Sequence, residues 1–173
     1  MKVRIVVLGA APPGLAAAVL ALLPSPLVAA AIERQKTPEA TCYNRRRGQL
    51  DALCVLDNLP APAEGEVVAA VTAIDLFAPP LAYVFGLSVL GSRRSVVSWS
   101  RLVVATGEDP ALLTRRLTTE VVHEVGHGLG LIHCPVPDCA MHRSFWAEAV
   151  DLKKPSYCVL CQQSLASHRV SQG

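Results

Sequence analysis

The strongest structural signal in this sequence is His123-Glu124-Val125-Gly126-His127-Gly128-Leu129-Gly130-Leu131-Ile132-His133, which fits the pattern H-E-x-x-H-x-x-G-x-x-H. On a helix, His123 and His127 lie one turn apart on the same face, so their imidazoles can share one metal ion. Glu124 lies beside His123, which directs its carboxylate toward a water on the metal rather than toward the metal. Gly130 can adopt a positive φ, so the helix can end there and the chain can turn back to supply His133 as a third ligand. Three neutral histidines leave the fourth tetrahedral position open, which is typical of catalytic zinc.

Four of the six cysteines follow this stretch closely, and they are Cys134, Cys139, Cys158 and Cys161. Their C-x4-C and C-x2-C spacing predicts a closed four-cysteine zinc site in a reducing compartment, or two disulfides in an oxidising one. Unpaired buried thiols are the third alternative. The chemistry of these cysteines therefore depends on the compartment.

The N-terminus bears on that compartment because it supports two interpretations. Two basic residues precede an uncharged stretch from Ile5 to Ala31 that ends in small residues, as in a secretory signal peptide. Four prolines interrupt this stretch, which argues against a membrane-spanning helix. The pieces between the prolines suit a strand from Val3 to Leu8, a helix from Pro13 to Leu23 and a strand from Leu27 to Ile32. We favour this strand-helix-strand interpretation, and with it a cytoplasmic protein; secretion through a cleaved signal peptide is the alternative.

The rest of the chain continues as alternating strands and helices of an α/β domain. Apolar spacing and turn residues predict a loop from Gln35 to Asn44, a helix from Arg46 to Leu59, a strand from Val67 to Ile74, a hairpin of Leu81 to Leu90 with Ser95 to Trp99, and a long helix from Asp109-Pro110 to about Gly128.

Composition excludes several classes of protein. Only 17% of the residues are charged and 51% are hydrophobic, so the chain is not a disordered tail or linker. A formal net charge of +2 is far from the clustered basic surface that binds nucleic acid. Aromatic residues make up 5% of the chain, too few for a platform that stacks single-stranded bases. We therefore expect neither a nucleic-acid partner nor stable insertion into a membrane.

The sequence resembles the archaemetzincins, small intracellular zinc metallopeptidases of the metzincin clan. The resemblance rests on His123-Glu124-x-x-His127-x-x-Gly130-x-x-His133-Cys134, Cys139-x-Met141 and Cys158-x-x-Cys161, and upstream on Tyr43-Asn44-x-Arg46-x-Gly48-Gln49, Val71-Thr72-x-x-Asp75-Leu76, Val84-Phe85-Gly86 and Ser98-x-x-Arg101-Leu102. It covers nearly the whole chain. Two small departures are a slightly short spacing between Met141 and Cys158 and an extra thiol at Cys42.

The resemblance implies one α/β (α+β) domain over residues 1–173, with a mixed sheet packed on helices and a zincin-type active-site helix. It implies two zinc ions, one catalytic on the three histidines and one structural on the four cysteines, the latter within a C-terminal subdomain at residues 134–161. Met141, which by itself would be an apolar gap filler, becomes the Met-turn beneath the metal ligands. The expected partner is a peptide or protein substrate.

These residues predict a zinc-dependent metallopeptidase. Zinc lowers the pKa of its water, Glu124 takes the proton, and the resulting hydroxide attacks a peptide carbonyl. A substrate could lie antiparallel along an exposed strand edge within Leu81 to Leu90. Two alternatives remain at this point: a secreted metzincin with disulfides in place of the four-cysteine zinc, and a non-catalytic, zinc-stabilised peptide-binding module.

Overall fold

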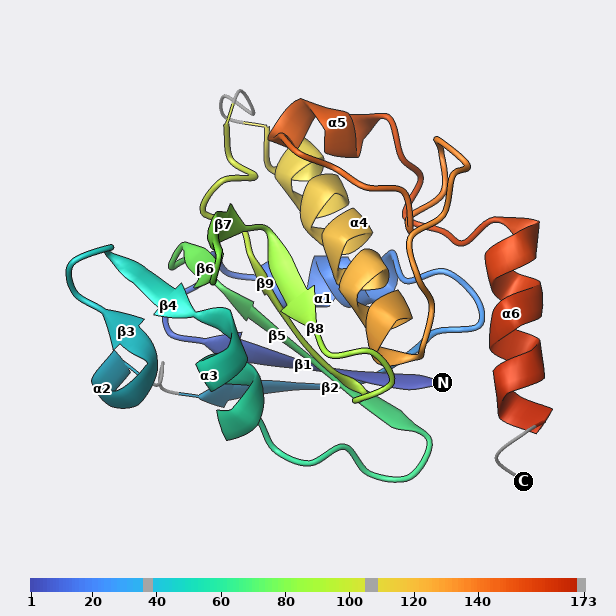
Figure 1. Cartoon of the computed structure of the whole chain (residues 1–173), viewed down its shortest axis with the longest axis horizontal. Helices are drawn as coiled ribbons and strands as arrows, with labels where there is room; N and C mark the ends of the chain where they lie inside the picture. The colour runs from blue at the N-terminus through green and yellow to red at the C-terminus, as the bar shows by residue number, and fades with distance from the viewer. Residues whose placement is uncertain (36–38, 105–108, 171–173) are drawn as a thin grey trace.

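A five-stranded mixed sheet lies at the centre of the structure (Figure 1), a computed structural model that describes residues 1–35, 39–104 and 109–170. The strand order is β2 (Val28–Gln35), β1 (Lys2–Leu8), β5 (Glu66–Thr72), β9 (Arg94–Ser98) and β8 (Gly86–Ser88). The first four strands are parallel, and β8 pairs antiparallel with β9 at the edge. The predicted mixed sheet and its hairpin are confirmed.

The first strand holds a central position in this sheet. Strand β1 pairs with β2 on one side and with β5 on the other, and its residues Val3, Ile5, Val6 and Val7 are fully buried. The predicted strand-helix-strand order is present, but helix α1 (Leu15–Ala21) begins two residues later than expected. Gly14 has a φ of 78° and cannot be part of a right-handed helix, so it caps the helix instead.

A second sheet of four short strands corrects the prediction for residues 46–59. Its order is β3 (Tyr43–Asn44), β4 (Gln49–Asp51), β6 (Leu76–Ala78) and β7 (Leu81–Val84). The expected helix from Arg46 to Leu59 is wrong in its first half, because Leu50 pairs with Leu76 in this sheet. Only α3 (Ala52–Asn58) is helical, and it starts where the Asp51 side chain accepts hydrogen bonds from two backbone N–H groups. The hairpin strand predicted at Leu81 to Leu90 is likewise split between β7 and β8.

The segment before β3 also departs from the sequence prediction. The loop expected from Gln35 to Asn44 contains a short helix, α2 (Glu39–Cys42), and strand β3, while residues 36–38 lie outside the described part of the chain. Cys42 is not an extra free thiol, because it forms a disulfide with Cys54 in α3. This disulfide joins α2 to α3 around the β3–β4 hairpin.

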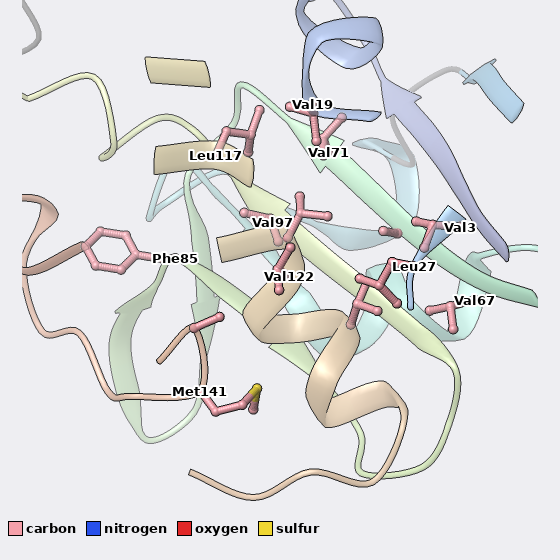
Figure 2. Packing of buried hydrophobic residues seen from close by; sticks show 14 of the residues in the cluster. Val3, Val19, Leu27, Val67, Val71, Phe85, Val97, Leu117, Val122 and Met141 are labelled. Atoms are coloured by element: carbon pink, nitrogen blue, oxygen red, sulfur yellow. The ribbon is translucent and has the colours of Figure 1, made fainter. Parts of the chain in front are cut away.

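Apolar side chains fill both faces of the central sheet. One cluster joins β1, β5 and β9 to α1 and to α4 (Pro110–Gly128), and Figure 2 shows Val19, Leu117 and Val122 packed over Val71 and Val97. A second cluster on the opposite face packs the sheet against α3 and the smaller sheet. Helix α4 begins as predicted, with the Asp109 carboxylate accepting hydrogen bonds from Ala111 and Leu112. The core therefore fixes α4 across one face of the central sheet.

The tail contains two helices that the sequence did not predict, α5 (Ala147–Asp151), which packs against α4, and α6 (Val159–Val170). Arg116, only 2% exposed, binds both carboxylate oxygens of Asp151 at 2.8 and 2.7 Å and so ties α4 to α5. Within the described residues, every helix is too short or too polar to cross a membrane.

Candidate active site

The three histidines of the motif converge at the end of α4. His123 and His127 lie on the last turns of the helix, and Gly130, with a φ of 97°, turns the chain so that His133 faces them. One ligand atom from each ring lies within 4.8 Å of the other two, and the Nε2 atoms of His123 and His127 are 3.2 Å apart. This arrangement matches the expectation drawn from the spacing, because a three-imidazole site needs its nitrogens at a common point.

Hydrogen bonds at Nδ1 orient each ring. Nδ1 of His123 lies 2.7 Å from the Ala140 carbonyl oxygen, and Nδ1 of His127 lies 2.7 Å from that of Leu131. A carbonyl can only accept, so both Nδ1 atoms carry the proton and both Nε2 atoms are free to bind a metal. At His133, Nδ1 accepts from Nε of Arg143 at 2.9 Å, so a neutral His133 carries its proton on Nε2 in this structure and must move it to Nδ1 to bind a metal through Nε2.

The environment keeps these imidazoles neutral, as metal ligation requires. Burial lowers the pKa of His123 well below its usual value, and the Lys153 ammonium lowers it further. The pKa of His127 is also lowered, chiefly by burial. Burial together with the neighbouring His127 lowers the pKa of His133 to about 4. All three side chains fit a zinc ion by donor type, convergence and protonation state.

Glu124 lies on the cleft side of α4, where it is only 6% exposed. Burial, reinforced by the Glu120 carboxylate, raises the pKa of Glu124 well above its usual value, while Lys153 opposes this rise. The opposite wall of the cleft comes close at Gly86, where a Cβ would lie 2.6 Å from Glu124 Cγ. A glycine at position 86 therefore makes room for the Glu124 side chain, a role that the sequence motif alone did not reveal.

The four tail cysteines form a second cluster. One sulfur from each of the four residues lies within 4.8 Å of the others. Cys134 and Cys158 sulfurs are 3.7 Å apart, and those of Cys139 and Cys161 are 3.8 Å apart, so all four thiols are free in this structure, in contrast to Cys42 and Cys54. Four converging free thiols fit the closed four-cysteine zinc site and disfavour the two-disulfide alternative.

Met141 is fully buried and lies beside α4 (Figure 2). It packs directly against Gly126, where a Cβ would collide with the Met141 sulfur and approach Tyr157 Cε1 to 3.1 Å. The Tyr157 hydroxyl donates to the Val122 carbonyl oxygen at 2.8 Å and secures the tail beneath the helix. Because Gly126 lies between two of the histidines, this close approach connects the tail to the metal-ligating turn.

A buried ion pair behind the histidines was missed by sequence reasoning. Lys153 Nζ donates to Glu120 at 2.8 Å and to the Ala140 carbonyl oxygen at 3.4 Å, and Ala140 is also the acceptor for His123. A lysine in a polar tail and a glutamate one turn before the motif give no sequence signal of pairing, because 33 residues separate them.

The site opens into a cleft of about 710 Å³. Strands β7 and β8 form one wall, α4 forms the floor, and residues 143–145 form the other wall. The Tyr83 hydroxyl donates to the Phe145 carbonyl oxygen at 2.9 Å and so bridges the two walls. Strand β8 is an edge of the central sheet, so its outer backbone groups face the cleft.

Comparison with known proteins identifies the family. Residues 41–167 match the sequence profile of Peptidase family M54. The chain is 40% identical over 134 residues to the archaemetzincin of Methanopyrus kandleri, covering 77% of this chain and 74% of the relative. It is 39% identical over 124 residues to the archaemetzincin of Archaeoglobus fulgidus, covering 72% and 73%.

The chain belongs to the archaemetzincins. As an archaemetzincin of family M54, it is a zinc metallopeptidase.

Solved archaemetzincin structures share this fold. The A. fulgidus archaemetzincin complexed with malonate superposes with a TM-score of 0.82 at 33% identity, covering 94% of this chain and 99% of the other. The M. kandleri archaemetzincin also gives a TM-score of 0.82, at 32% identity, covering 98% and 95%. Metalloproteinase-II from Bacteroides fragilis, at 10% identity and a TM-score of 0.54, shares the fold alone.

Proposed function

We propose that this archaemetzincin hydrolyses peptide bonds with Glu124 as the general base, in a site whose zinc is held by His123, His127 and His133. The observation that carries the proposal is a buried carboxylate beside three neutral, converging imidazoles on the floor of an open cleft. Zinc in such a site supplies Lewis-acid activation of water and of the peptide carbonyl.

Glu124 manages the protons of the reaction. Its carboxylate takes a proton from the attacking water and passes that proton to the leaving amine nitrogen. A raised pKa suits both halves of this role, because a base closer to neutrality also releases its proton as an acid. Burial of Glu124 keeps bulk water away from the transferred proton.

A second, structural zinc belongs to the same proposal. The thiols of Cys134, Cys139, Cys158 and Cys161 would hold it as a closed site that stabilises the tail. Met141 then acts as the Met-turn, an apolar floor that packs beneath the histidines without binding the metal.

The substrate is a peptide that adds antiparallel to β8. Edge strand β8 offers backbone donors and acceptors along Gly86 to Ser88, and Gly86 packs directly against Glu124. Main-chain pairing of this kind binds peptides with modest side-chain selectivity.

The variant Glu124→Gln tests the catalytic assignment. It preserves shape and hydrogen bonding but not basicity, so we expect unchanged zinc content and folding with at least a roughly hundredfold loss of peptide cleavage. Glu64→Gln, at an exposed position before β5, is the matched control and should cleave like the parent. Cleavage by the Glu124 variant at the parental rate would refute the assignment.

Metal analysis tests the two-zinc proposal. The open histidine site exchanges with solvent, so a chelator should remove its zinc first, while the four-cysteine zinc should leave only with loss of structure. Two zinc ions per chain with unequal lability are expected. A single zinc together with thiols that react only after reduction would favour disulfides, and two zincs without any peptidase activity would favour the non-catalytic binding module.

For the compartment, we propose that residues 1–31 are retained and that the protein acts in the cytoplasm. The central place of β1 in the sheet supports retention, because cleavage would remove a strand that pairs on both sides. The Cys42–Cys54 disulfide favours the secreted alternative, because disulfides are uncommon in reducing compartments. N-terminal sequencing of the protein purified from its host separates the two: a chain starting near Ile32 would mean secretion.

A further inference from the structure

One positive charge faces the cleft without a carboxylate partner. Arg143 is the only lysine or arginine among the described residues that line the cleft, and the surrounding walls are largely apolar. The two lining carboxylates do not pair with it within the described residues, since Glu120 binds Lys153 and Glu124 forms no ion pair. By contrast, Arg101 and Arg116 each bind an aspartate. Arg143 is therefore available to an anionic group that enters the cleft.

An unsatisfied hydroxyl lies beside it. The Oγ atom of Ser144 is shielded from solvent, lines the same wall, and has no hydrogen-bond partner among the described residues. A buried hydroxyl without a partner is costly, and such groups in native proteins usually have a function. Arg143 and Ser144 together provide a charged donor and a neutral donor on one wall.

Coordination of a metal by His133 would free Arg143 further. In this structure the guanidinium donates from Nε to Nδ1 of His133. A neutral His133 that binds a metal through Nε2 carries its proton on Nδ1, and a protonated Nδ1 cannot accept a hydrogen bond. With a metal on Nε2 of His133, the nitrogens of Arg143 would thus be left for another acceptor.

The sheet determines which part of a peptide meets this wall. A peptide that pairs antiparallel with β8 runs opposite to the direction from Gly86 to Ser88. Its C-terminal half therefore passes toward Phe85 and Tyr83, which precede β8 in the chain. Tyr83 is hydrogen-bonded to Phe145, two residues beyond Arg143. Arg143 and Ser144 accordingly face the part of the substrate on the C-terminal side of the scissile bond.

We propose that Arg143, assisted by Ser144, binds a carboxylate of the substrate on the C-terminal side of the scissile bond, so that the enzyme prefers peptides carrying a carboxylate there. The inference rests on the proposed function and names its substrate class. The carboxylate is either the free C-terminus of a short peptide or an acidic side chain, and both present the same planar acceptor to a guanidinium.

Matched peptides test the proposal on the zinc-loaded, full-length enzyme. Each peptide is compared with its C-terminal amide, and each Asp or Glu placed after the scissile bond is compared with Asn or Gln. The comparison is made for the parent, Arg143→Gln, Arg143→Lys, Ser144→Ala and Arg34→Gln. Arg34 is the control cation, exposed on β2 at the opposite edge of the central sheet from β8.

We expect the parent to favour the carboxylate member of a pair by roughly ten- to a hundredfold in kcat/KM, as for a charge-assisted hydrogen bond. Arg143→Gln should abolish this preference, Arg143→Lys should restore part of it, Ser144→Ala should weaken it, and Arg34→Gln should leave it intact. If the preference appears in the pairs of free acid and C-terminal amide, the C-terminal carboxylate is the ligand. If it appears in the pairs of Asp with Asn and Glu with Gln, the acidic side chain is the ligand.

A binding measurement separates this proposal from the proposed function. Calorimetric titration of zinc-loaded Glu124→Gln with the same pairs needs no turnover. A carboxylate preference there that Arg143→Gln removes supports the role of Arg143 even if no peptide is cleaved. Equal binding and cleavage of both members of each pair, or a preference that survives Arg143→Gln, would overturn it. A variant that lost zinc but kept the preference would show that Arg143 only positions His133.

Discussion

The ammonium of Lys153 donates to Glu120 at 2.8 Å in a setting where the two side chains are only 1% and 5% exposed. The same ammonium contacts the Ala140 carbonyl oxygen that accepts from His123 Nδ1. The pair thus neutralises a buried carboxylate one turn before the metal motif and fixes the loop that orients a metal ligand. Pairing is required because an isolated charge at this depth is strongly unfavourable.

Replacing Lys153 by Met should lower the free energy of unfolding by about 3 to 5 kcal/mol, because the Glu120 carboxylate remains buried without a counter-charge. Denaturant unfolding of the zinc-loaded protein measures the loss, and the double variant Lys153→Met/Glu120→Gln should recover part of it. Lys154→Met is the neighbouring control. Lys154 pairs with Asp138 at the surface, with side chains 68% and 50% exposed, so solvent screens the pair and its loss should have little effect on stability. Equal costs for the two lysines would contradict this account.

Gly126→Ala should destabilise the protein and weaken its hold on the labile zinc. The added methyl group collides with Met141, and overpacking of this kind costs about 1 to 3 kcal/mol. Gly128→Ala is the matched control within the same helix, because its Cβ would approach the Ser88 hydroxyl to 3.2 Å and otherwise make ordinary contacts, with Arg93 Cα at 3.5 Å and Arg94 N at 3.6 Å. Thermal unfolding and zinc titration with a competing chelator compare them. A smaller loss of stability for Gly126→Ala than for Gly128→Ala would mean that the Met141 side chain moves aside without cost.

Acid should destabilise the folded chain through its histidines. The pKa values of His123, His127 and His133 are all lowered on folding, that of His133 to about 4. Between about pH 6.5 and 4 the unfolded chain therefore binds protons that the folded chain does not, and stability falls as the pH falls through this window. Zinc binding adds to the same trend, because protons compete for the ligands.

Urea unfolding at constant ionic strength, repeated from pH 7.5 to pH 4, measures this dependence. His133→Gln should show a shallower decline than the parent across the window. A decline of the same slope would assign the acid sensitivity to other groups.

Removing the disulfide should cost stability without affecting zinc. Cys42 and Cys54 are 12 residues apart, and closing a loop of about this length contributes roughly 2 to 4 kcal/mol to stability. We expect Cys42→Ser/Cys54→Ser to unfold at lower denaturant concentration while retaining the parental zinc content. Thiol titration of the unfolded, metal-free parent without reductant should find four thiols. Six reactive thiols would show that the disulfide does not form in solution.

A chain that starts at Ile32 should fail to fold even when zinc is supplied. It lacks β1, α1 and half of β2, so β5 loses a paired neighbour, and the apolar cover from Leu15 and Val19 is lost. At about 25 cal/mol per Å² of apolar area, the burial lost with several such side chains would remove most or all of a typical free energy of unfolding of roughly 5 to 15 kcal/mol. Circular dichroism and analytical size exclusion give the result. Cooperative folding of the shortened chain with bound zinc would support a cleaved signal peptide.

Features that depend on local chain geometry were predictable from the sequence. The spacing of His123, His127 and His133 works through helical periodicity and one glycine turn, and the structure brings the three rings together as expected. The β-branched run at β1 and the Asp-Pro start of α4 likewise specify their own elements. In these places local propensity and tertiary packing favour the same conformation.

Tertiary structure decided the features that depend on contacts between residues distant in sequence, including those where such contacts override the local conformational preference. The residues from Arg46 have a helical pattern, yet part of this segment forms strand β4, because Leu50 gains backbone pairing with β6, 26 residues away. A short helix at this position would be less stable than that pairing. The partners of Cys42 and Lys153 depend on which segments the sheet and α4 bring together. The place of Arg143 in the cleft depends on contacts of the tail with β7 and α4, and neither its spacing nor its neighbours in sequence encode that position. The sequence alone thus determined the chemistry of the motif, whereas burial and long-range contacts determined what surrounds it.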